Sequence, residues 1–179
     1  MRPIPSLALA LTMPLAVSQA GADDFTTRVA MHEKSAQTFY VPGDIKGYGA
    51  VELMVDTGSG YTTINEATLA ELKRHGGARY LRQLVGVLAD GSETEVPVYA
   101  IEHMSIGGNC WLRDVEVAVF PGTSRQILGL SALRKAAPFI FSVDPPALVL
   151  SRCATASVAE ITSDVTGTPV LQALAASSR

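Results

Sequence analysis

The chain has 179 residues, with 14 Lys or Arg against 17 Asp or Glu and a formal net charge of −3. A nucleic-acid-binding protein needs clustered basic residues to neutralise phosphates, so this composition argues against that class. Ten of the eleven aromatic residues lie between Phe39 and Phe141. The core therefore belongs to residues 39–153, about 115 residues, which is enough for one compact domain and too few for a two-lobed enzyme.

Residues 1–22 are predicted to be a signal peptide. Arg2 precedes an apolar segment over residues 4–17, and small residues suited to cleavage follow at Ser18, Ala20 and Ala22. An uncleaved membrane anchor is the alternative. The prolines and the shortness of the apolar run disfavour it, because a spanning helix needs roughly 20 apolar residues. We therefore expect an exported protein, periplasmic or secreted, with no membrane span after cleavage.

Short apolar runs separated by Gly, Pro and Asp begin at Phe39 and are typical of an all-β domain. Residues 23–38 before them fit either a linker or a first edge strand. The expected strands of the first half cover residues 39–41, 50–55 and 61–64, with a turn over 42–49. Asn65 is suited to cap a helix over residues 66–74, which Gly76-Gly77 would end.

The second half of the domain is predicted to contain two hairpins and a short helix. Ala89-Asp90-Gly91 is a strong turn signal between strands over residues 84–88 and 94–101. The other expected elements are a half-buried strand over 115–119, a helix over 131–136 and a closing hairpin over 139–143 and 147–150. Residues 154–179 have few charges and no aromatic residue, so we expect a flexible tail there.

The two cysteines and three histidines indicate no cofactor. Cys110 and Cys153 fit a disulfide in an oxidising compartment and fit two separate buried thiols equally well. The histidines, at positions 32, 75 and 103, do not have the spacing of a metal site. We therefore expect neither a metal nor another cofactor.

The segment from Leu53 to Ser59 carries the chemistry. Its apolar strand ends at Asp56, and an unpaired carboxylate at a buried strand end is costly. We expect backbone N–H groups of the following turn to hold Asp56, with Gly58 allowing their close approach. Thr57 adds a hydroxyl that can hydrogen-bond inside the protein, and the Ser59 hydroxyl can reach the carboxylate. The alternative is an ordinary Asx-turn after a strand.

Three features together resemble the retropepsin-type aspartic proteases, above all their bacterial, exported, single-domain members. They are Asp56-Thr57-Gly58-Ser59 after an apolar strand, a hairpin with Ala89-Asp90-Gly91 at its tip, and Ile127-Leu128-Gly129 before a short helix. The likeness covers residues 39–151. It implies a retropepsin-like domain over residues 39–153, a small closed all-β barrel with one or two short helices that acts as a homodimer.

The resemblance also implies roles for individual residues. Asp56 would be the catalytic carboxylate, Thr57 would hydrogen-bond across the dimer axis, and the hairpin over residues 84–101 would be the flap that covers the substrate. Residues 127–129 would pack behind the active-site loop. Two departures leave the flap's reach and the pocket's shape open. Position 131 is Ser where retroviral members tend to carry a charged pair, and the helix over 66–74 lengthens the stretch from Asp56 to Gly91.

Peptide hydrolysis without a metal or a nucleophilic side chain needs one carboxylate to activate water and a second, protonated one to polarise the carbonyl. This chain has one Asp-Thr-Gly sequence, and Asp164-Val165-Thr166-Gly167 contains an extra residue. The second Asp must then come from another copy. We therefore predict an endopeptidase acting on peptide or protein substrates. A non-catalytic peptide-binding or dimerisation module is one alternative, and a monomer paired with a different protein is another.

Overall fold

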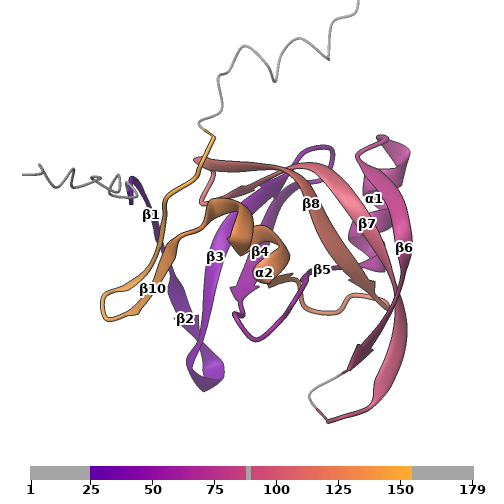
Figure 1. The fold of residues 1–179 in the computed structure, drawn as a ribbon, viewed down its shortest axis with the longest axis horizontal. Coiled ribbons are helices and arrows are strands. Elements are labelled where there is room, and N and C mark those ends of the chain that lie inside the picture. The colour runs from indigo at the N-terminus through magenta and orange to yellow at the C-terminus, as the bar shows by residue number, and fades with distance from the viewer. Residues whose placement is uncertain (1–24, 88–89, 155–179) are drawn as a thin grey trace, which may run out of the picture.

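The computed structural model of the protein describes residues 25–87 and 90–154 (Figure 1). The predicted signal peptide, Ala89 and the predicted tail beyond Ala154, including Asp164, lie outside the described residues. No helix within the described ranges is both long enough and apolar enough to cross a membrane.

Most of the strands belong to one sheet that closes on itself. Its order is β2-β3-β4-β9-β5-β8-β7-β6, and β3 also pairs with β7. The six strands from β3 round to β7 therefore form a closed ring, with β2 and β6 attached outside it. The bounds are β2 His32–Lys34, β3 Thr38–Ile45, β4 Gly49–Val55, β5 Thr62–Asn65, β6 Ala78–Val87, β7 Glu93–Ile106, β8 Cys110–Phe120 and β9 Ile127–Leu128. The prediction of a small closed all-β barrel with short helices is confirmed.

Alternating residues of the strands fill the barrel. In β4, Val51, Leu53 and Val55 are buried, whereas Ala50 and Glu52 are exposed. This period of two places one face of the strand in the core and leaves the other outside. Asp56 follows directly after the last of these buried residues, so the core packing of β4 fixes the position of the Asp56 backbone.

The helices are short, as expected. In α1 (Glu66–Arg74) the backbone N–H of Thr68 donates to Oδ1 of Asn65 at 2.9 Å, which confirms the predicted N-cap. Leu69 and Leu72 point into the core. The helix expected over residues 131–136 is a turn of α-helix, α2 (Leu130–Leu133), continued by the 3₁₀ segment η2 (Arg134–Ala136). A second 3₁₀ segment, η1 (Ser35–Gln37), joins β2 to β3.

The turn predicted over residues 42–49 is wrong in its first half. β3 continues to Ile45, and the turn occupies only residues 46–48. Pro42 and Gly43 both pair with β4, and the pairing of β3 with β7 begins at Gly43. A Cβ at Gly43 would lie 2.8 Å from the backbone oxygen of Ser105, so glycine here permits close approach of two strands instead of a turn.

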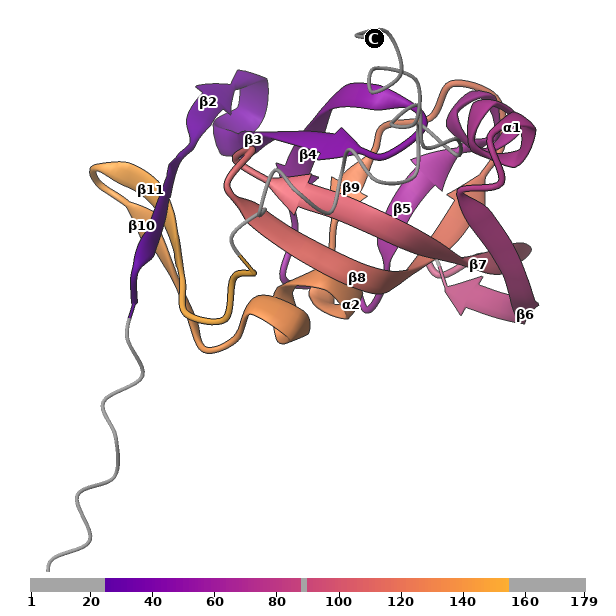
Figure 2. The ribbon, with the colours of Figure 1, turned by 90° about the horizontal axis from the view of Figure 1, so that it is seen from above.

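A separate three-stranded sheet stands beside the barrel (Figure 2). It has the order β1-β11-β10, with β1 Thr27–Ala30, β10 Phe139–Val143 and β11 Pro146–Leu150. Of the two alternatives for residues 23–38, the structure therefore has an edge strand over residues 27–30, and β2 follows it. The closing hairpin of the chain is present as β10 and β11.

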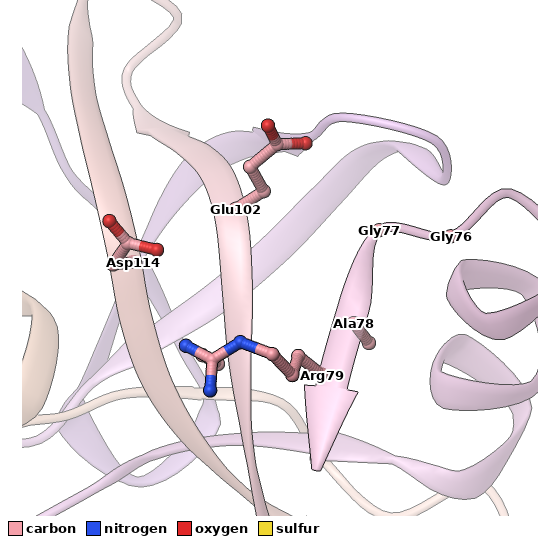
Figure 3. A pocket seen from close by; sticks show the side chains of 7 residues that line it. Gly76, Gly77, Ala78, Arg79, Glu102 and Asp114 are labelled. Atoms are coloured by element: carbon pink, nitrogen blue, oxygen red, sulfur yellow. The ribbon is translucent and has the colours of Figure 1, made fainter. Parts of the chain in front are cut away.

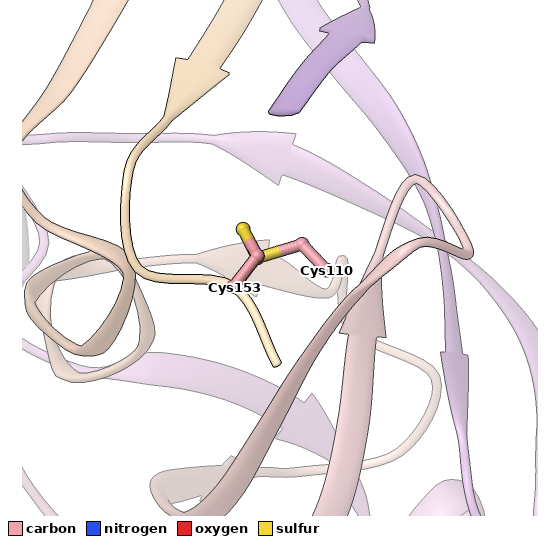
Figure 4. Close-up of a disulfide and its surroundings, with 2 residues drawn as sticks. All are labelled: Cys110 and Cys153. Atoms are coloured by element: carbon pink, nitrogen blue, oxygen red, sulfur yellow. A yellow bond between two sulfur atoms is a disulfide. The ribbon is translucent and has the colours of Figure 1, made fainter. Parts of the chain in front are cut away.

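A disulfide joins Cys110, at the start of β8, to Cys153 after β11 (Figure 4). Of the two alternatives for the cysteines, separate thiols are thus wrong. The link spans 43 residues of sequence. A disulfide closing such a loop stabilises a domain by roughly 2–4 kcal/mol. It ties the C-terminal segment to the barrel, as does the hydrogen bond from the Trp111 N–H to the Ala154 carbonyl.

Candidate active site

Asp56 lies in the loop that leads from β4 to β5, and its side chain is partly exposed. Its Oδ1 accepts a hydrogen bond of 2.9 Å from the backbone N–H of Gly58. A Cβ at position 58 would lie 3.2 Å from that same oxygen. Glycine therefore lets the backbone come close enough to hold the carboxylate, as the sequence led us to expect.

Strand β9 holds this loop from behind. β4 and β9 pair in parallel, with Met54 opposite Ile127. The Asp56 N–H donates to the Leu128 carbonyl at 3.1 Å, and the Leu130 N–H donates to the Ser59 carbonyl at 2.9 Å. The structure thus brings residues 127–129 and the loop at residues 56–60 together.

Gly129 sits where the two segments are closest. A Cβ at this position would lie 2.1 Å from the backbone oxygen of Tyr61. The Gly129 N–H also donates to the hydroxyl of Thr62 at 3.2 Å. Because no side chain fits, the apolar-apolar-Gly sequence is a packing requirement of the loop.

The two hydroxyl residues of the loop differ from expectation. The Ser59 hydroxyl donates to the Tyr61 carbonyl at 2.7 Å and not to Asp56, because that carbonyl lies within reach two residues along the turn. Thr57 is exposed, and within the described part of the chain its hydroxyl has no hydrogen-bond partner. Its predicted bond inside a single chain is therefore absent.

Ser131, which departs from the retroviral pattern, forms a bridge under the site. Its hydroxyl accepts from the Thr62 N–H at 2.8 Å and donates to the Glu116 carbonyl at 2.6 Å. The Ser131 side chain on α2 thereby links the start of β5 to β8. Sequence reasoning missed this role, since its partners lie 69 and 15 residues away.

The predicted flap is a long hairpin made of β6 and β7. Its strands extend beyond the predicted ranges, because β6 begins at Ala78 and β7 ends at Ile106. Near the tip, Oδ1 of Asp90 accepts from the N–H and the hydroxyl of Ser92, and these bonds lower the pKa of Asp90. Gly91 has the positive φ of +81° that the turn requires. The hairpin projects past the end of the barrel at which β4 ends (Figure 1).

Arg82 connects this hairpin to the Asp56 loop. Its Nη2 donates to the hydroxyl of Tyr61 at 2.8 Å and to Oε2 of Glu116 at 2.6 Å. The bonds to Glu116 and Tyr61 raise the pKa of Arg82 above its ordinary value, so the guanidinium stays charged. The sequence did not reveal this contact, because its three members come from β6, the loop and β8.

The sequence model of the aspartyl protease family matches residues 41–132, slightly more than half of the chain. The chain belongs to the aspartyl protease family. The matched region contains the Asp56 loop, both strands of the hairpin and the Ile127-Leu128-Gly129 segment.

A solved structure supports the fold assignment for this aspartyl protease family member. The crystal structure of a retropepsin-like aspartic protease from Rickettsia conorii is similar, with a TM-score of 0.50 and 18% sequence identity. The match covers 73% of this chain and 92% of that one. The fold is therefore retropepsin-like. A search of curated proteins found no match.

A shallow pocket elsewhere on this aspartyl protease family member contains none of the predicted site residues. It is lined by Gly76, Gly77, Ala78, Arg79, Ala100, Glu102 and Asp114 (Figure 3). Its three charged side chains are all exposed, so no buried polar group marks it as a reaction centre. Among residues 25–87 and 90–154, no group of three or more His, Cys, Asp or Glu is arranged to hold a metal ion.

Proposed function

We propose that the protein is a homodimeric aspartic endopeptidase in which Asp56 from each of two copies forms the catalytic pair. The observation that carries this proposal is the Asp56 loop, where a partly exposed carboxylate accepts a hydrogen bond from the Gly58 N–H and β9 holds the loop backbone. Membership of the aspartyl protease family supports the reaction class.

One copy supplies only half of the required chemistry. Residues 127–131, which hold the Asp56 loop from behind, contain no acidic side chain. Two carboxylates that share a site hold one proton between them, because both cannot ionise cheaply. The ionised one would take a proton from water as it attacks the peptide carbonyl. The protonated one would polarise that carbonyl, and a proton then passes to the leaving amine as the C–N bond breaks.

The exposed Thr57 supports the dimeric arrangement. Its hydroxyl has no partner within the described residues and follows Asp56 directly, so a second copy facing the loop would meet it. The substrate would bind as an extended strand between the loop and the β6–β7 hairpin, through backbone hydrogen bonds.

We further propose that the protein acts outside the cytoplasm. The N-terminal segment has the composition of an export signal. The Cys110–Cys153 disulfide supports this proposal, since structural disulfides form and persist in oxidising compartments.

Replacing Asp56 by Asn tests the chemistry. Asp56→Asn should lower the rate of casein cleavage at least about 100-fold, because it removes the group that activates water. Asp144→Asn, the same change at an exposed turn between β10 and β11, should leave the rate unchanged. Activity should be highest at acidic pH, where the pair holds its single proton. Wild-type cleavage by Asp56→Asn would refute the mechanism, and peptide binding without turnover at every pH would favour a non-catalytic binding module.

A further inference from the structure

Arg125 is an exposed cationic side chain that contacts β4 two residues before Asp56. It lies in the loop between β8 and β9, and its Nη1 is 3.3 Å from Sδ of Met54. Met54 precedes Asp56 by two residues. Val51, Leu53 and Val55 of β4 point into the core, so Met54 lies on the outer face. Residues two apart along a strand share a face and are separated by roughly 7 Å.

The guanidinium of Arg125 has no anionic partner among the described residues. Arg74 and Arg82 contact Glu71 and Glu116, respectively, whereas the contact of Arg125 is with a thioether, which is a weak acceptor. Most of its five N–H donors are therefore left for another acceptor.

The acidic residue on the same face of β4 is already engaged. Glu52 accepts hydrogen bonds from Lys34 and His32, and the bond from Lys34 is the main reason why the pKa of Glu52 is lowered. Glu52 is thus paired with two groups on β2 and is not the partner of the Arg125 guanidinium.

The backbone around Arg125 is fixed from several sides. The hydroxyl of Thr63 donates to the Arg125 carbonyl at 3.5 Å, and Nδ2 of Asn65 donates to the Ser124 carbonyl at 3.0 Å. The next residue, Gln126, accepts from the Met54 N–H at 3.1 Å and donates through Nε2 to the Thr68 hydroxyl. A cation on such an anchored loop loses little further freedom when it binds an anion.

We propose that Arg125 is a specificity-determining residue that selects substrates with a carboxylate side chain within one or two residues of the scissile bond. The inference rests on the proposed function. A peptide cleaved at Asp56 advances about 3.3 Å per residue along its strand, so a neighbouring side chain on the β4 side reaches the Met54 position. There a Glu or Asp side chain would form a charge-assisted hydrogen bond with the guanidinium.

Matched peptides that differ only by Glu or Gln at each position flanking the cleaved bond would test the proposal. For wild type we expect kcat/KM roughly 10-fold higher for the Glu peptide at one of these positions, the effect of one hydrogen bond to a charged group. Arg125→Met should remove the preference and Arg125→Glu should reverse it toward Lys. Arg134→Met, at an exposed arginine of η2, should keep it.

The pH dependence of the preference for Glu over Gln peptides shows whether Arg125 recognises the charge or the shape of the substrate side chain. The preference should decline as pH falls through about 4.3, where a substrate Glu takes up its proton. A preference that is equal above and below this pH, or one that survives in Arg125→Met, would overturn the proposal.

The two proposals fail in different ways. Cleavage that depends on Asp56 but treats Glu and Gln peptides alike refutes the role of Arg125 and leaves the protease function standing. If no peptide is cleaved, the affinities of the Asp56→Asn variant for the same peptides test the role of Arg125. Tighter binding of a Glu peptide that is lost in Asp56→Asn/Arg125→Met supports acidic selection, and equal affinities refute it.

Discussion

Single residues set the geometry of the Asp56 loop, and two glycines do so for different reasons. Gly58 lets its own N–H reach the carboxylate of Asp56. Gly129 leaves room for the Tyr61 carbonyl, which occupies the space where a side chain would begin. The first glycine serves the chemistry of the loop, and the second serves its support.

Gly129→Ala should therefore be destabilising, although alanine is a small residue. Its Cβ would lie 2.1 Å from a backbone oxygen, so either β9 or the Asp56 loop must move. We expect a loss of about 1–3 kcal/mol in the free energy of unfolding, measured with urea, together with loss of cleavage. Gly60→Ala is the matched control in the same loop, because a Cβ at position 60 meets nothing within 4 Å. Equal stability of the two variants would contradict this account.

At the scale of elements, β6 is the outer strand of the β6–β7 hairpin, and a side chain ties it to the Asp56 loop. β6 is the last strand in the order, with a partner on one side only. The bonds from Arg82 to Tyr61 and Glu116 attach it to the loop and to β8. Under the proposed function, Arg82 is thus a positioning residue that fixes the hairpin relative to the Asp56 loop.

Replacing Arg82 by Met should loosen the hairpin without unfolding the barrel. The pair is exposed, so we expect at most about 1 kcal/mol of lost stability. Amide exchange in β6 should accelerate, and KM should rise several-fold with a smaller change in kcat. Arg82→Lys should restore this only in part, because an ammonium lacks the fork that serves two acceptors. Arg79→Met is the control on the same strand. If amide exchange in β6 were equally fast in Arg82→Met and Arg79→Met, the positioning role of Arg82 would be refuted.

At the scale of the whole molecule, the loop between β4 and β5 contributes one carboxylate, that of Asp56. The barrel is complete without a partner, because β3 pairs with β7 and closes it. The proposed reaction is not complete, since it needs two carboxylates. Under the proposed function, assembly is therefore required for activity and not for folding.

A mixing experiment tests that arrangement directly. When wild type is refolded with an excess of the Asp56→Asn chain, most wild-type chains should pair with an inactive partner, and the activity per wild-type chain should fall toward zero. Excess Asp144→Asn chain should cause no such loss. Light scattering should give the mass of a dimer for the active species. Undiminished activity in the first mixture, or an active monomer, would rule out the shared site.

The sequence by itself determined the features that depend on neighbouring residues. Asn65 caps α1 three residues away, and Gly58 reaches Asp56 two residues away, so both could be predicted from local chemistry. Short apolar runs separated by Gly, Pro and Asp likewise predicted the all-β class. The apolar strand before Asp56 and the glycine after it, taken together with the hairpin signal and Ile127-Leu128-Gly129, located the candidate carboxylate.

Only the tertiary structure decided the features that join distant segments. Pro42 and Gly43 have the local character of a turn, but barrel closure places them in β3, against β7. Ser131 bridges to Thr62 across 69 residues, and Arg125 meets Met54 across 71. Such contacts depend on the path of the whole chain and leave no periodic pattern in the sequence. For this reason the catalytic candidate and, by resemblance, the support at residues 127–129 could be found from the sequence, whereas the contacts of Ser131 and Arg125 could not.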